Sequence, residues 1–125
     1  MKTIINSKNA PAPIGPYSQA ILSGNTLFAS GQIAINPATG ELEMSSIEEE
    51  TKQVMQNIKA VLEEADMTFE NIVKCSIFLS SMDSFSRVNE VYGKYFPTNP
   101  PARETVEVSC LPKSVNVEIS FIAIK

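Results

Sequence analysis

Arg87 and Arg103 are the only two arginines in this chain of 125 residues. Arg103 follows Pro100-Pro101-Ala102, which stiffens the backbone before it, and it opens a predicted strand. A guanidinium group on a rigid element can hold a carboxylate through two parallel hydrogen bonds. Arg103 is therefore the first candidate for a ligand-binding residue. The alternative is an ordinary salt bridge or a solvated strand end.

Glu118 is the second candidate, because it lies between Val117 and Ile119 in the most apolar segment of the chain. A carboxylate in such surroundings must be hydrogen-bonded, paired or protonated. The alternative is a strand residue that faces solvent. Alternation along a strand puts Arg103 and Thr105 on the same side. If that strand and the last one form a hairpin, we expect Arg103, Thr105 and Glu118 to share one polar patch.

Three further residues stand out by their type and position. Asn89 is an amide at the margin of an apolar helical stripe, where it either satisfies backbone groups or faces a pocket. Tyr17 belongs to a proline-rich loop and either forms a pocket wall or simply packs. Gly31 either leaves strand backbone bare for a ligand or marks a bulge. Each of these three signals is weak when taken alone.

The composition excludes several kinds of chemistry. Histidine is absent, so there is no Ser-His-Asp triad, no HExxH zinc site and no imidazole base. Cys75 and Cys110 lie far apart without a CxxC motif, and we expect both to pack as small hydrophobic residues. The net charge of −4 argues against nucleic-acid or anionic-membrane partners. Catalysis must therefore use Arg, Glu, Tyr, Thr, Asn, backbone groups and water.

Length and hydropathy predict a single cytoplasmic domain. A chain of 125 residues corresponds to one domain, which we expect to span residues 1–125. The first residues lack the apolar stretch of a signal peptide. No apolar run approaches the roughly 18 residues that would cross a membrane.

Hydrophobic periodicity predicts the elements that must position the candidate residues. Two helices are expected, over residues 47–65 with Ser46 and Glu49 as a capping box, and over residues 85–96 with Asp83 or Ser84 as the cap. Glu48–Glu50 in the first helical turn are interpreted as favouring the helix dipole and solubility. The predicted strands cover residues 2–5, 19–23, 26–30 with a continuation over 32–35, 72–79, 103–110 and 115–124.

This order of elements predicts an α+β domain with two helices on one face of a mixed, six-stranded sheet. Gly24-Asn25 suits a type II′ hairpin, and residues 111–114 are expected to join the last two strands. Two helices cannot cover both faces of such a sheet. The final strand is apolar on both sides, so we expect the second face to meet another subunit in a homo-oligomer.

Six segments, taken in order along essentially the whole chain, resemble the RidA (YjgF) family of reactive-intermediate imine/enamine deaminases. They are Ile14–Ala20, Ala29–Ile33, Val88–Tyr92, Pro101–Val108, Leu111–Lys113 and Val117–Ile119. The resemblance implies a chorismate-mutase-like fold assembled as a homotrimer. The sheets would form a barrel-like core with the helices outside, and three ligand clefts would lie between neighbouring subunits.

The resemblance also implies an activity, the hydrolysis of 2-imino acids such as 2-iminopropanoate and 2-iminobutanoate to 2-oxo acids and ammonia. The family uses no metal or organic cofactor. Arg103 matches the arginine that binds the substrate carboxylate, and other cleft residues match Tyr17, Gly31, Asn89 and Glu118. We expect Glu118 to organise water and protons and Thr105 to orient the ligand. A subset of the family has cysteine where this chain has Thr105, which excludes thiol chemistry there.

Two other functions are weighed against deamination. Some family members carry the label of endoribonuclease or translation inhibitor. The lack of histidine, the two arginines and the net charge of −4 speak against phosphate binding. A non-catalytic protein that binds small 2-oxo acids is the other alternative, because a fold does not guarantee a function.

Overall fold

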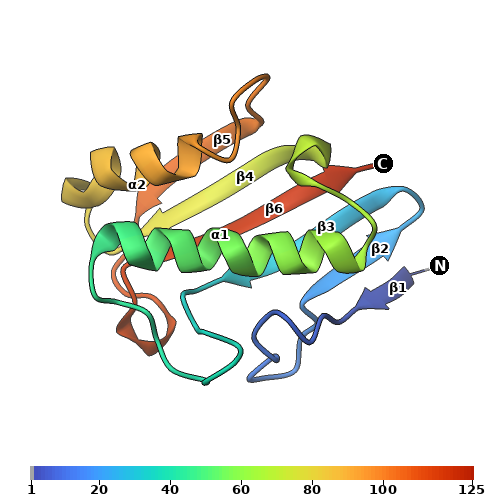
Figure 1. Ribbon diagram of the computed structural model, residues 1–125, viewed down its shortest axis with the longest axis horizontal. Coiled ribbons are helices and arrows are strands. Elements are labelled where there is room, and N and C mark those ends of the chain that lie inside the picture. Colours follow the sequence, from blue (N-terminus) through green and yellow to red (C-terminus); the bar gives the residue numbers. More distant parts are fainter. Residues whose placement is uncertain (1) are drawn as a thin grey trace.

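Six strands form one mixed sheet in the computed structural model, which describes residues 2–125. The sheet order is β1-β2-β3-β6-β4-β5, and two helices cover one face of it (Figure 1). The predicted α+β class is therefore confirmed. The strands are β1 (Lys2–Ile5), β2 (Ala20–Ser23), β3 (Thr26–Gln32), β4 (Ile72–Leu79), β5 (Ala102–Glu107) and β6 (Val117–Ile124), and the helices are α1 (Ile47–Glu64) and α2 (Phe85–Gly93).

Helix α1 forms where its apolar stripe and its cap predict it. The Ser46 side chain accepts a hydrogen bond from the backbone N–H of Glu49 at 3.0 Å, which satisfies one of the free donors of the first turn. The stripe Val54, Ile58 and Val61 is fully buried and packs over β3 and β6. Among residues 2–125, no helix combines the length and the apolarity that crossing a bilayer requires.

Helix α2 begins at Phe85 as predicted, but its capping and its C-terminal end differ from the prediction. Ser84 is at the N-cap position but makes no capping bond through its side chain, because its backbone is already helical after the preceding 3₁₀ turn. Ser81 caps that turn instead, accepting from the N–H of Asp83 at 3.1 Å. At the other end, the α-helix stops at Gly93 rather than at residue 96. The next residues form tighter bonds, with the Phe96 N–H donating to the Gly93 carbonyl.

The first hairpin has the predicted turn. Strands β2 and β3 pair antiparallel with Ser23 opposite Thr26. Gly24 has a φ of +62° while Asn25 does not have a positive φ, which fits a type II′ turn. The predicted continuation over residues 32–35 is wrong, since β3 ends at Gln32 after a bulge and Ile35 forms only an isolated bridge with Leu42.

The expected hairpin of the last two strands is wrong. Strand β5 pairs in parallel with β4, and β4 lies between β5 and β6. The cause is the βαβ unit β4–α2–β5, since a helical crossover returns the chain parallel to the strand it left. Residues 108–116, with a 3₁₀ turn at Pro112–Ser114, then cross the end of β4. Cys110 is exposed on this surface connection, against the prediction, whereas Cys75 is buried as predicted.

The two faces of the sheet have different surroundings. The face under the helices carries the buried core, including Cys75, Ile77 and Ile119. On the open face, strand register aligns a row of apolar side chains across four strands, formed by Ile4, Ile21, Phe28 and Ile122. Ile4 is 61% exposed and Phe28 is 49% exposed. An aligned, exposed apolar row is typical of a surface that packs against another molecule.

Candidate functional site

Arg103 lies on the edge strand β5 with its side chain on the helix-covered face, because its register partner is the buried Cys75. Helix α2 presents Phe85, Asn89 and Tyr92 to it, at the spacing that puts side chains on one helical face. The Arg103 Nη1 donates to Asn89 Oδ1 at 2.7 Å. The Arg103 Cζ lies 5.7 Å from the ring centroid of Phe85 and 5.1 Å from that of Tyr92, within cation–π range.

The guanidinium group of Arg103 keeps free donors at a cleft. Among residues 2–125 it forms no salt bridge, and its Nε and Nη2 groups make no hydrogen bond. The cleft beside it has a volume of about 540 Å³. Its lining is one cation, one amide and otherwise apolar or aromatic surface: Asn89, Tyr92, Gly93, Phe96, Pro100, Pro101 and Arg103. Such a cleft suits a small carboxylate that carries an apolar group.

Two buried hydroxyl groups belong to the same side of the sheet as Arg103. Thr105 follows two residues later on β5, and its Oγ1 is buried without a hydrogen-bond partner among residues 2–125. The Tyr92 hydroxyl is also buried and lies beside the Cys75 thiol without an aligned hydrogen bond. Burial raises the pKa of Cys75 and, together with that thiol, the pKa of Tyr92. Both groups are therefore protonated at neutral pH.

Glu118 and Gly31 form a second cluster on the open face. Glu118 is the register partner of Phe78 on β4, is partly buried, and makes no hydrogen bond within the described residues. Burial without a partner raises the pKa of its carboxyl group. Gly31 lies in the bulge of β3, directly under this carboxylate, and a Cβ at Gly31 would overlap the Glu118 side chain. Gly31 thus marks a bulge, as one of the two interpretations of the sequence expected. Its bare backbone also permits close approach, but the group that approaches it in this chain is the Glu118 side chain rather than a ligand.

Tyr17 stands apart from the Arg103 cleft. It is 49% exposed, and its hydroxyl accepts a 3.4 Å hydrogen bond from the N–H of Ile14 within the same loop. The loop is fixed to β3 near Gly31, because Ser30 Oγ donates to the Ser18 carbonyl at 2.6 Å. The buried Gln19 amide also ties the loop together through bonds to the backbone of Ser7 and Pro11. Tyr17 therefore belongs to the part of the chain that holds Gly31.

The structure divides the predicted site residues into two groups. Arg103 of β5 binds Asn89 of α2, and Thr105 lies on the same sheet face, whereas Glu118 and Gly31 lie on the opposite face. The expected patch that joins Arg103, Thr105 and Glu118 within one chain is wrong. The reason is that β4 separates the two strands, and side-chain alternation directs the partners of Cys75 and Phe78 to opposite faces.

Glu50 holds the beginning of β6, a role that the interpretation of Glu48–Glu50 did not include, and the solubility part of that interpretation is wrong for Glu50. Its carboxylate is fully buried and accepts three hydrogen bonds, from Asn116 N at 2.7 Å, Asn116 Nδ2 at 2.9 Å and Val117 N at 3.0 Å. Glu50 therefore fixes the beginning of β6, the strand that carries Glu118. The sequence contained a signal for this burial, because Glu50 lies three residues after Ile47 and four before Val54, on the apolar stripe of α1.

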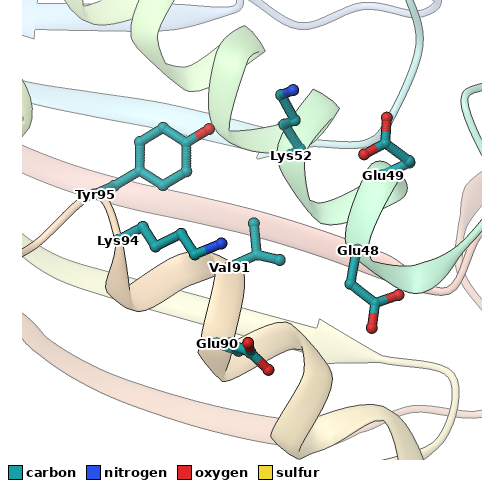
Figure 2. Close-up of a pocket in the computed structure, with 7 residues that line it drawn as sticks. All are labelled: Glu48, Glu49, Lys52, Glu90, Val91, Lys94 and Tyr95. Atoms are coloured by element: carbon teal, nitrogen blue, oxygen red, sulfur yellow. The ribbon is translucent and has the colours of Figure 1, made fainter.

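A second concavity, of about 360 Å³, lies between α1 and α2 (Figure 2). Both lysines that line it are exposed, and the Lys94 side chain extends along the groove beside Val91. Glu48 pairs outside the groove with Arg87, with Oε1 and Nη2 2.7 Å apart, and this hydrogen bond lowers the pKa of Glu48 to about 2. Exposed charges of both signs are typical of a solvated helical surface, so this groove is not the candidate site.

Comparisons with known proteins identify the family. The family model described as Endoribonuclease L-PSP matches residues 7–125. A RutC family protein from Pyrococcus horikoshii is 51% identical over 125 residues, covering 100% of this chain and 99% of that protein. The solved structure of YyfA from Yersinia pestis, described as a member of the conserved Rid protein family, superimposes with a TM-score of 0.97 at 52% identity, covering 100% of both chains. The chain belongs to the RidA (YjgF) family.

Membership of the RidA family confirms the resemblance found in the sequence. Among its relatives, a bovine protein named 2-iminobutanoate/2-iminopropanoate deaminase is 43% identical over 125 residues, covering 100% of this chain and 91% of that protein. The names within the RidA family therefore include a deaminase as well as RutC and endoribonuclease labels.

Proposed function

We propose that this chain is a hydrolytic deaminase of small 2-imino acids, such as 2-iminopropanoate and 2-iminobutanoate, and acts as a homotrimer. The observation that carries the proposal is the free donor edge of Arg103 at a cleft with mostly apolar walls. A single bound carboxylate, held through two parallel hydrogen bonds, would satisfy that edge. The deaminase name of the bovine relative supports the same substrate class.

The second part of the proposal concerns where the complete cleft forms. Arg103 and Glu118 lie on opposite faces of one sheet, so a cleft that uses both must take them from two subunits. The exposed row of Ile4, Ile21, Phe28 and Ile122 supports packing of the open face against a second copy. In this arrangement Glu118 and Gly31, with Tyr17 in the adjoining loop, complete the Arg103 cleft of a neighbouring subunit.

The proposed chemistry adds water across a C=N bond. Arg103 binds the substrate carboxylate through Nε and Nη2 while Asn89 holds Nη1. The Glu118 carboxyl group, with its raised pKa, donates a proton to the imine nitrogen, which makes the carbon more electrophilic. The resulting carboxylate accepts a proton as water attacks that carbon. Glu118 then donates this proton to the carbinolamine nitrogen, ammonia leaves, and the hydroxyl proton returns to the Glu118 carboxylate as the C=O bond of the 2-oxo acid forms. Thr105 orients the ligand through its buried hydroxyl.

A trapping assay tests the activity. A pyridoxal-phosphate threonine dehydratase generates 2-iminobutanoate, semicarbazide traps the remaining imine, and the purified protein is added in increasing amounts. We expect wild type to reduce the trapped fraction. In Arg103→Ala, the loss of two charge-assisted hydrogen bonds of about 1.5–3 kcal/mol each lowers turnover at least about 100-fold. Equal trapping with and without wild-type protein contradicts the proposal. Binding of 2-oxobutanoate without turnover then favours the non-catalytic alternative.

Mixing subunits tests the shared cleft. Arg103→Ala and Glu118→Gln proteins, each inactive alone, are unfolded together and refolded as mixed oligomers. If each cleft takes Arg103 from one subunit and Glu118 from its neighbour, random mixing restores about one quarter of the clefts. A mixture that stays inactive while its oligomers form normally contradicts the shared cleft. An RNA-cleavage assay on the same preparations tests the endoribonuclease alternative, which the net charge of −4 disfavours.

A further inference from the structure

The position of Arg103 depends on groups other than an ion pair. Its strand is at the edge of the sheet, and no acidic side chain holds its guanidinium within residues 2–125. A long side chain in this situation loses considerable rotamer entropy when it is fixed for binding. The Asn89 amide restrains one end of the group at 2.7 Å. The plane of the guanidinium group must be set by what lies against its face.

Tyr92 is the better supported of the two rings that face this guanidinium. Its centroid is nearer to the Arg103 Cζ, at 5.1 Å against 5.7 Å for Phe85. Tyr92 is only 5% exposed, whereas Phe85 is partly buried. Cation–π attraction strengthens when the groups are desolvated. The buried Tyr92 ring is therefore the stronger partner for the Arg103 cation.

The Tyr92 ring is itself held firmly. Its centroid lies 4.8 Å from that of Phe96, and Phe96 packs edge-on against Phe69 at 5.7 Å. At its far end, the Tyr92 hydroxyl reaches the Cys75 thiol, on the residue of β4 that is paired with Arg103. The ring thus spans from α2 to the sheet beside Arg103. The Tyr92 hydroxyl makes no aligned hydrogen bond, so the ring rather than the hydroxyl restrains Arg103.

We propose that Tyr92 is the positioning residue of the carboxylate clamp. Its ring fixes the plane of the Arg103 guanidinium so that the Nε and Nη2 edge faces the cleft. This inference rests on the proposed function in assigning the bound group as a carboxylate. The statement about the arginine itself concerns the free protein. It can therefore be tested without substrate.

The experiment exploits the presence of only two arginines in the chain. A ¹⁵N spectrum of the arginine Nε–Hε groups contains one signal for Arg103 and one for Arg87, which serves as the internal control. We expect the Arg103 Nε order parameter in wild type to be near 0.85, the value of rigid backbone. In Tyr92→Phe it stays there, because the ring remains. In Tyr92→Leu it falls below about 0.6, while the Arg87 signal is unchanged.

Binding of 2-oxobutanoate, measured by calorimetry, is the second readout. The loss of a buried cation–π contact in Tyr92→Leu raises the Kd about five- to thirtyfold, and Tyr92→Phe changes it less than about twofold. Tyr95→Leu is the matched control, since Tyr95 packs on Phe69 at 5.1 Å and does not line the Arg103 cleft. It leaves both readouts at wild-type values. If Tyr92→Leu does not fold, Tyr92→Met replaces it, because methionine fills irregular space without a ring.

Three results overturn the inference. The first is an unchanged Arg103 order parameter in a folded ring-less variant. The second is a Tyr92→Phe protein that is as impaired as Tyr92→Leu, which would assign the role to the hydroxyl. The third is an equal effect in Tyr95→Leu, which would indicate a general effect of helix packing. If the order parameters behave as expected but wild type neither binds 2-oxobutanoate nor consumes imine, the positioning stands and the proposed function fails.

Discussion

Replacing Gly31 by alanine separates the stability of this protein from its proposed activity. A Cβ at Gly31 would overlap the Glu118 side chain, so the carboxylate must move. The overlapping atoms belong to a flexible side chain rather than to backbone, and Gly31 does not have a positive φ. Alanine is therefore compatible with the local backbone. The side chain of Glu118 absorbs the change.

The expected change in stability is small because two effects oppose each other. Alanine in place of glycine stabilises by about 0.4–1 kcal/mol through the lower entropy of the unfolded chain. Displacing Glu118 from its preferred rotamer costs about 0.5–1.5 kcal/mol. The free energy of unfolding should therefore change by less than about 1 kcal/mol, which is about 4 °C or less in Tm for a domain of 125 residues. Turnover depends on where Glu118 lies, so kcat should fall about 100-fold or more.

The assay combines imine turnover with urea unfolding at one fixed chain concentration. In a Glu118→Ala background no overlap remains, so Gly31→Ala should then stabilise the protein by the full 0.4–1 kcal/mol or so. A Gly31→Ala protein with wild-type kcat would refute the reasoning. Equal stability effects of Gly31→Ala in both backgrounds would refute it as well.

Three other substitutions probe the remaining parts of the site. Arg103→Lys keeps the positive charge but loses the planar pair of N–H donors that binds a carboxylate. We expect kcat/KM to fall about 10- to 100-fold while sedimentation shows an unchanged oligomer. Wild-type turnover would contradict the role of Arg103 in binding the carboxylate. Glu50→Ala leaves the N–H groups of Asn116 and Val117 without their acceptor. The free energy of unfolding, measured in urea, should fall by about 3 kcal/mol. A fall of less than about 1 kcal/mol would mean that β6 begins correctly without Glu50. Because the folded pKa of Glu118 is raised above its ordinary value of 4.5, its contribution to stability is complete below that pH and is lost as pH rises through the folded value. Relative to Glu118→Gln, wild type should therefore lose stability as pH rises above about 4.5, and parallel stability curves would contradict the shift.

The sequence predicted those elements whose signal is local. The cap at Ser46, the apolar stripe of α1 and the alternation of β4 are each contained in one short segment, and each element formed at nearly the predicted residues. The turn at Gly24-Asn25 is equally local. These predictions succeeded because periodicity and capping depend on neighbours in the chain.

The position of β5 in the sheet, unlike these local elements, depends on residues far apart in the sequence. The short connection predicted over residues 111–114 favoured a hairpin of the last two strands, but the strand–helix–strand order β4–α2–β5 favours a parallel pair. In the structure β5 pairs with β4 in parallel, and β6 pairs with the other edge of β4. The hairpin would have put Arg103 beside β6. In the structure β4 separates β5 from β6, and side-chain alternation along each strand decides which face Arg103 and Glu118 occupy.

The candidate site was predicted by residue type but not by environment. Arg103, Asn89 and Glu118 were identified because a charged or polar group in an apolar context needs a partner. Tyr92 was not among the candidate residues, since an aromatic residue on a helical stripe carries no sign of what faces it. Its contact with Arg103 arises from the packing of α2 over β5, which one sequence does not specify.

The division of the candidate residues between two sheet faces would make the activity depend on the concentration of the protein. If the clusters meet only between copies, as proposed, an isolated chain carries every necessary side chain and still has no complete cleft. Activity would then depend more steeply than linearly on the amount of protein whenever that amount is near the dissociation constant of the assembly. A cell that halves its supply of this chain near that threshold would lose more than half of the activity. Dilution alone would act as an inhibitor.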